Sequence, residues 1–113
     1  IAKHKANGHY YNEQLKDVKG VTLLENKEGH DSAYWIYTIK VERQEDFMAK
    51  MKEKGIMVSR VHERNDKHTC VQEFKSALPN LDKVVKEMIC IPVGWWVTKD
   101  QREYIIKSIK KGW

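Results

Sequence analysis

Residues 32–42, SAYWIYTIKVE, form the segment that most limits how this chain can fold. Side chains two positions apart in an extended chain point to the same side. Here one side carries Trp35, Tyr37, Ile39 and Val41. This alternation, with its β-branched and aromatic residues, predicts a β-strand. We expect its aromatic side to face the core of the protein.

One helix is predicted before this strand in the sequence, and one after it. Tyr11, Leu15 and Val18 recur at helical spacing, and Gly20 follows them as a stop. Residues 43–55, RQEDFMAKMKEKG, carry acids in the first turn, lysines near the end and a glycine just beyond. That arrangement suits the helix dipole and a glycine C-cap. The buried stripe of this second helix is expected to consist of Phe47, Met48 and Met51.

Two further helices are predicted in the second half of the chain. The first follows Pro79, which suits an opening turn that needs no N–H donor. The second opens on Thr98 and Gln101, the two residues of a capping box, and is closed by Gly112. Both have apolar side chains at helical spacing. These are Leu81, Val84, Val85 and Met88 in the first, and Ile105, Ile106 and Ile109 in the second.

Three more segments are expected to be extended. Residues 21–26, VTLLEN, form a short extended piece, and residues 56–61, IMVSRV, are predicted as a second strand. A third short strand at residues 88–94, MICIPVG, is ended or moved to a sheet edge by Pro92. The order of elements predicts an α+β fold, a two-layer unit of about three strands covered on one face by helices. We expect residues 1–113 to form a single domain.

The composition narrows the class of protein. Charged residues make up 33% of the chain and apolar residues 41%, which is typical of a soluble globular domain. The longest apolar runs, VGWWV and AYWIY, are too short to span a bilayer, and the first residues contain no apolar signal region. Cys70 and Cys90 form no CxxC motif, which favours reduced thiols and a cytoplasmic location.

Residues 60–70, RVHERNDKHTC, concentrate charged and reactive side chains. His62, His68 and Cys70 are conceivable metal ligands, but their spacing matches no familiar zinc motif. Cys70 as a nucleophile would need one of the histidines as a base. We favour the interpretation that Cys70 packs as a small apolar residue. Neither metal binding nor cysteine catalysis is therefore predicted.

Binding of a phosphorylated ligand is the better supported chemistry for the same loop. Arg60, Arg64 and Lys67 lie around a turn-forming Asn65-Asp66 pair. Guanidinium groups match the geometry of phosphate oxygens. No glycine-rich phosphate cradle is present. An ordinary charged connection stays an equal alternative on the residues alone.

Trp95 and Trp96 directly precede the last predicted helix. Two indoles at such a place can stack on a base or a sugar. We favour the interpretation in which one ring fills the core and the other lies half exposed at an interface.

The order of these motifs resembles the C-terminal domain of the DegT/DnrJ/StrS family of pyridoxal-phosphate-dependent sugar aminotransferases. The resemblance covers essentially the whole chain. Its most specific parts are the helix-to-strand junction at Met51–Ile56 with the histidine-containing loop that follows, and the ending IPVGWWVTKDQREYII. It implies the fold of the small C-terminal domain of fold-type I aminotransferases.

The resemblance also implies an activity for a larger parent enzyme. Members of the family transfer an amino group, usually from glutamate, to a keto group of a nucleotide-linked sugar. The cofactor lysine belongs to a large N-terminal domain that is absent from this chain, so we expect no catalytic lysine here and no activity from the chain alone. The parent would use pyridoxal phosphate, and its active site would form at the interface of a homodimer.

In the family, the loop after the second predicted strand reaches toward the substrate. The resemblance therefore implies substrate contacts within Arg60–His68. Glu63 and Arg64 stand where a tyrosine and a proline commonly precede the loop histidine, which leaves open which histidine corresponds. The implied substrate-binding residues are Arg60, His62, Arg64, Asn65, Asp66 and His68.

Two alternatives come from other classes of protein. A freestanding basic module that binds RNA or single-stranded DNA is compatible with the net charge of +5. It is less favoured, because the aromatic face of the strand is better explained as core and no RNP-like motif occurs. The other alternative is a dimerising remnant that exposes the apolar surface once covered by the large domain.

Overall fold

The structure, a computed structural model, describes all residues from Ile1 to Trp113. It confirms the α+β prediction: the chain forms a three-stranded sheet accompanied by four α-helices and two short 3-10 helices. The elements, in chain order, are α1 (Ala2–Leu15), β1 (Val21–Leu23), β2 (Tyr37–Val41), α2 (Gln44–Glu53), η1 (Asn65–Lys67), η2 (Thr69–Phe74), α3 (Pro79–Glu87), β3 (Met88–Ile91) and α4 (Lys99–Lys110).

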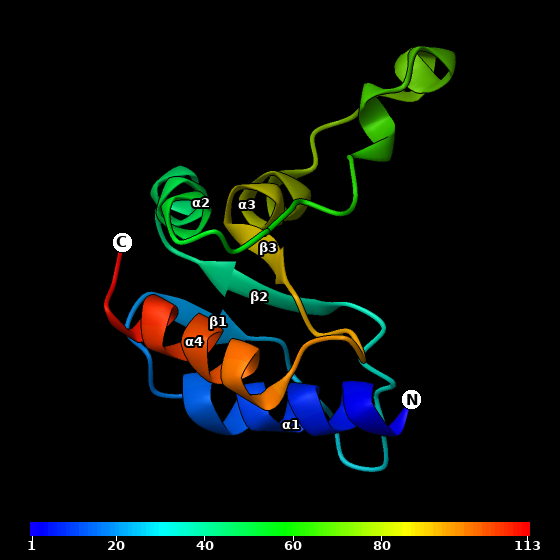
Figure 1. Ribbon diagram of the computed structural model, residues 1–113. Coiled ribbons are helices and arrows are strands. Elements are labelled where there is room, and N and C mark those ends of the chain that lie inside the picture. The colour runs from blue at the N-terminus through cyan, green and yellow to red at the C-terminus, as the bar shows by residue number, and fades with distance from the viewer.

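The sheet is antiparallel, and β2 is its central strand, with β1 on one side and β3 on the other. Ile39 fixes the register, because it is opposite Leu23 of β1 and Ile89 of β3. Figure 1 shows α1 and α4 alongside each other below the sheet, and α2 and α3 above it. Helices therefore lie on both sides of the sheet, and the expectation that they cover only one face is wrong. None of the helices is both long and apolar enough to cross a membrane.

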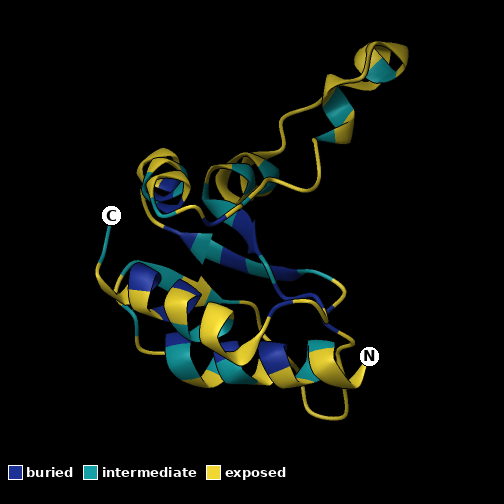
Figure 2. Ribbon diagram, viewed as in Figure 1, coloured by how far each residue is buried: buried dark blue, intermediate teal, exposed yellow.

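The core is one cluster of side chains from the sheet and from α1, α2 and α4. The alternation of β2 is confirmed over Tyr37, Ile39 and Val41, which are buried, while the residues between them are half-buried. In Figure 2 the buried positions are the dark blue stretches of the ribbon, on the strands, on parts of the helices and on the connections next to them. Phe47 and Met51 are fully buried, as the helical spacing predicted for α2.

The prediction for Trp35 is wrong, because its side chain is 75% exposed. The strand begins only at Tyr37, so its alternation does not extend back to Trp35. Tyr34, on the opposite side of the predicted strand, is buried instead and has a positive φ of 47°. Its ring lies over Gly8 of α1, where an added Cβ would be only 2.4 Å from the Tyr34 Cγ atom.

The strand predicted for residues 56–61 is also wrong. These residues form only an isolated bridge, in which Ser59 and Cys90 exchange backbone hydrogen bonds of 3.1 and 2.8 Å. The third strand of the sheet is β1, which was expected only as an extended piece. The pairing beside β3 is limited to Ser59, and the side chain of the next residue, Arg60, donates a hydrogen bond to Gln44 of α2.

The ends of the last two helices follow the sequence signals closely. Thr98 Oγ1 accepts a hydrogen bond of 3.2 Å from the Gln101 backbone N–H, and the Gln101 side chain accepts one of 2.9 Å from the Thr98 N–H. The predicted capping box is therefore present. Helix α3 begins at Pro79 as expected, but it buries none of its residues completely, and Met88 already belongs to β3.

Candidate functional site

Residues 61–77, here called the arm, project away from the body of the protein (Figure 1). They contain η1 and η2, and none of them is buried. In Figure 2 the arm is mostly exposed, with short intermediate stretches and no buried ones. Since the arm has no apolar core of its own, polar contacts must set its position.

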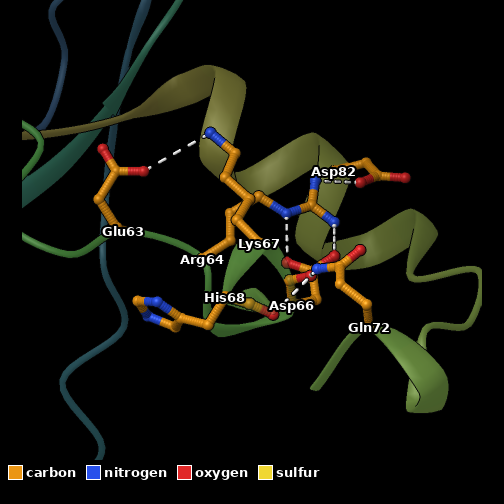
Figure 3. Close-up of polar contacts among 7 residues, drawn as sticks. All are labelled: Glu63, Arg64, Asp66, Lys67, His68, Gln72 and Asp82. Carbon is orange, nitrogen blue, oxygen red and sulfur yellow. Dashed lines mark hydrogen bonds and ion pairs between the residues drawn. The ribbon is translucent and has the colours of Figure 1, made fainter. Parts of the chain in front are cut away.

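Arg64 makes the main contacts that position the arm (Figure 3). Its Nε donates to Asp66 Oδ1 over 2.8 Å, and its Nη2 donates to Asp66 Oδ2 over 2.6 Å. This is the two-pronged geometry in which a guanidinium binds a carboxylate most strongly. Nη1 donates to Asp82 in the first turn of α3. Arg64 thereby ties the arm to the body of the domain.

Arg60, the residue directly before the arm, is fixed to the body of the domain. Its Nε donates to Gln44 Oε1 over 2.8 Å, and its Nη2 pairs with the carboxylate of Glu45. Gln44 is itself buried and donates to the backbone carbonyl of Val85 in α3 over 3.2 Å. The residue that precedes the arm is therefore fixed to both α2 and, through Gln44, α3.

Within the arm, Gln72 connects the two short helices. Its Nε2 donates to the backbone carbonyls of Asp66 and His68 over 2.9 and 3.0 Å. Lys67 and Glu63 form an exposed ion pair of 3.5 Å. Figure 3 shows that the His68 imidazole points away from the Arg64–Asp66 pair, and its ring is left without a side-chain partner.

The structure divides the six sequence-predicted residues into two groups. Arg60, Arg64 and Asp66 are engaged in contacts within the chain. The other three have exposed side chains that make no hydrogen bond in the chain. These are His62, Asn65 and His68.

The two cysteines and the histidines do not form a reactive centre. Cys70 is exposed, so the interpretation that it packs as a small apolar residue is wrong. Cys90 is buried with its Sγ atom 3.2 Å from Thr38 Oγ1. No group of three His, Cys, Asp or Glu side chains is arranged to hold a metal ion. The chemistry available on the arm is therefore hydrogen bonding and charge.

Asp82 and Gln44 are the residues of this region that sequence reasoning missed. Asp82 is 18 positions from its partner Arg64, so spacing along the chain gives no indication of the contact. The only sequence signal for Asp82 was its place in the first turn of a predicted helix. The helix dipole already explains an acidic residue there, so this signal did not indicate a contact with Arg64.

Acidification should loosen the arm. The pKa of Asp66 lies below its usual value, chiefly because Arg64 donates hydrogen bonds to the carboxylate. The contribution of Asp66 is thus present above the ordinary aspartate pKa of about 3.9 and is lost as pH falls through the lowered pKa of the folded protein. NMR order parameters for residues 65–68 should stay constant down to a pH of about 4 and fall below it.

The matched control is Asp66→Asn, which cannot form the ion pair at any pH. Its arm should show low order parameters that do not respond to pH in this range. The explanation would be wrong if the variant reproduced the pH profile of the unchanged protein.

Comparison with known proteins identifies relatives for the whole chain. Residues 1–110 match the sequence model of the DegT/DnrJ/EryC1/StrS aminotransferase family. The curated erythromycin biosynthesis sensory transduction protein EryC1 of Saccharopolyspora erythraea is 22% identical over 98% of this chain and 31% of its own.

Two solved structures are more similar. The sugar aminotransferase CalS13 of Micromonospora echinospora is 37% identical, with a TM-score of 0.96 over 100% of this chain and 31% of its own. AtS13 of Actinomadura melliaura is 36% identical, with the same TM-score over 100% of this chain and 30% of its own. The chain thus spans less than a third of the length of these relatives.

Proposed function

This chain belongs to the DegT/DnrJ/EryC1/StrS aminotransferase family, and from that premise we propose that it is the small C-terminal domain of a pyridoxal-phosphate-dependent aminotransferase for nucleotide-linked sugars. The observation that carries the proposal is the likeness of the entire chain to one part of a sugar aminotransferase. The parent enzyme is proposed to be a cytoplasmic homodimer.

The residues present here do not fit the cofactor itself. Pyridoxal phosphate is held as a Schiff base by a lysine in a site closed to water. The only buried polar or charged residues of this chain are Asn7, Gln44 and Ser108, so no lysine is enclosed. We therefore assign the cofactor to the other part of the parent, and we expect no amino transfer by this chain alone.

The arm is proposed to contact the substrate. A nucleotide-linked sugar carries a diphosphate and many hydroxyl groups, which need both donors and acceptors. His62, Asn65 and His68 offer such groups on the exposed side of the arm. Arg64 and Asp66 hold these residues in place, and Arg60 combines its contact to α2 with a positive charge near the diphosphate.

A first experiment joins this chain to the cofactor domain of a relative. We expect the joined protein to bind pyridoxal phosphate and to absorb visible light. A folded joined protein that keeps its cofactor lysine but stays colourless would contradict the proposal.

In such a joined enzyme, Arg64→Ala should raise the KM for the nucleotide-linked sugar by about 10- to 100-fold. This is the loss expected when hydrogen bonds to a charged group, worth roughly 1.5 to 3 kcal/mol, no longer position a binding segment. Steady-state kinetics measure the effect. The matched control is Glu73→Ala, an exposed acid on the arm without an ion pair, whose KM should not change. An unchanged KM for Arg64→Ala would remove the arm from the substrate site.

The nucleic-acid alternative receives no support. The aromatic and aliphatic side of β2 is buried, so the sheet offers no exposed platform of stacked side chains. None of the relatives described above is a nucleic-acid-binding protein by its name.

A further inference from the structure

Four large apolar side chains gather on a surface that the arm does not use. They are Met57, Trp95, Trp96 and Tyr104, here called the tryptophan face, with exposed fractions of 84%, 63%, 62% and 49%. Met57, Trp96 and Tyr104 line a groove of about 300 Å³, in which no lining residue is charged. The Trp95 and Trp96 rings meet edge to face with centroids 5.9 Å apart.

The groove continues toward α2. A second hollow of about 500 Å³ shares Gly55, Ile56 and Met57 with the first. It adds Met48 and Ala49 of α2, and its border carries the charged residues Glu45 and Lys52. The hollowed surface therefore runs from α4 across residues 55–58 to α2, with an uncharged part near α4 and a charged border at α2. A cluster of exposed apolar side chains rimmed by polar residues can mark a site of contact with another part of a protein.

The tryptophan face is held in position by the core. Buried Asn7 of α1 places its Nδ2 atom 3.2 to 3.3 Å from the backbone carbonyls of Val93, Gly94 and Val97. The Trp96 ring lies directly on Gly94, where an added Cβ would be 2.3 Å from ring atoms. Tyr104 donates its hydroxyl to the Lys54 carbonyl over 3.1 Å. The exposed rings are thus presented by a fixed turn.

We propose that the remaining part of the parent enzyme packs on the tryptophan face. The inference rests on the proposed function, because it requires a parent chain. More than two thirds of each similar solved chain lies outside the region matched here, and a polypeptide of that size is the occupant that the proposed function supplies. An uncharged groove rimmed by aromatic residues has the composition of the dry centre of a protein interface. A second copy of the chain is a poorer occupant, since both copies carry the same net charge of +5.

Oxidative footprinting with mass spectrometry tests the inference. The 113-residue chain and the joined enzyme are exposed to hydroxyl radicals, and modification of Met57 and Trp96 is compared. We expect modification at both residues to be about tenfold slower in the joined enzyme, because the centre of an interface excludes water. Met57→Glu should restore modification of Trp96 in the joined enzyme, whereas Met57→Leu should not.

The outcomes separate this inference from the proposed function. If the joined enzyme binds pyridoxal phosphate and transfers amino groups while Met57 and Trp96 are modified as fast as before, the inference is wrong and the proposed function stands. If the joined enzyme neither binds pyridoxal phosphate nor transfers amino groups, the proposed function is wrong, and the inference that rests on it is wrong as well. Protection that arises in the chain alone as its concentration rises would show that a second copy covers the face, which also overturns the inference.

Discussion

Asn7→Ala is expected to lower the free energy of unfolding by about 2 to 4 kcal/mol. The Asn7 side chain is 4% exposed, and its amide group serves three backbone carbonyls of the turn before α4. Its Oδ1 atom also accepts a hydrogen bond of 3.3 Å from Arg102, whose Nε is buried without a partner. Alanine would leave several of these buried polar groups unsatisfied. Chemical denaturation of the purified chain measures the change.

The same substitution should disturb the tryptophan face, because Asn7 holds the turn that presents Trp95 and Trp96. The matched control is Glu13→Ala on α1, which removes only an exposed pair with Lys16 and should change stability by less than about 0.5 kcal/mol. Equal stability of the two variants would show that the turn does not depend on Asn7.

Phe47→Ala is expected to lower the free energy of unfolding by about 3 to 5 kcal/mol, because it removes a large side chain from the core and leaves a cavity. Phe47 of α2 is fully buried and meets the Trp113 ring edge to face, with centroids 4.9 Å apart. The indole N–H of Trp113 donates to the Glu42 carbonyl over 2.7 Å, so the final residue closes this side of the core.

Phe74→Ala provides a control with the same chemical change in a different environment. Phe74 lies on the arm and is 75% exposed, so its removal should change stability by less than about 0.5 kcal/mol. A small loss for Phe47→Ala, close to that for Phe74→Ala, would contradict the described core.

The elements that the sequence predicted well are those whose signals are local. The Thr98–Gln101 capping box, Pro79 at the start of α3, and the acids and lysines at the two ends of α2 act within a turn or two of the helix. Such contacts depend on nearest neighbours along the chain, so reading the sequence in short windows captures them.

The elements that were missed depend on distant partners. Trp35 and Tyr34 exchange their expected roles because Gly8 leaves room for the Tyr34 ring, a contact between α1 and the residues before β2. Residues 56–61 have the composition of a strand, yet they pair with β3 only at Ser59, and the Arg60 side chain contacts Gln44 of α2. The alternation of side chains that predicts a strand gives no information about either contact.

At the candidate site, the sequence indicated a charged connection but not the contacts within it. The charged composition of residues 60–70 indicated a binding loop, and the structure places these residues on and next to a projecting arm. It could not indicate that Arg64 is already occupied by Asp66 and Asp82. The favoured interpretation of Trp95 and Trp96 needs correction as well, because both rings are largely exposed and neither fills the core.

The arm and the tryptophan face together give this domain two proposed tasks in its parent enzyme. We propose that the arm presents His62, Asn65 and His68 to the substrate and that the tryptophan face fixes the domain against the part that holds the cofactor. The Asn7 and Phe47 variants test the fold that carries both surfaces.

The most direct test of the central proposal is amino transfer by a CalS13 enzyme whose matching 31% is replaced by this chain. We expect the exchanged enzyme to bind pyridoxal phosphate and to transfer an amino group to a nucleotide-linked sugar faster than CalS13 that lacks this segment. A folded, cofactor-bound exchanged enzyme that transfers no faster than the shortened one would contradict the proposal that this chain is an aminotransferase domain.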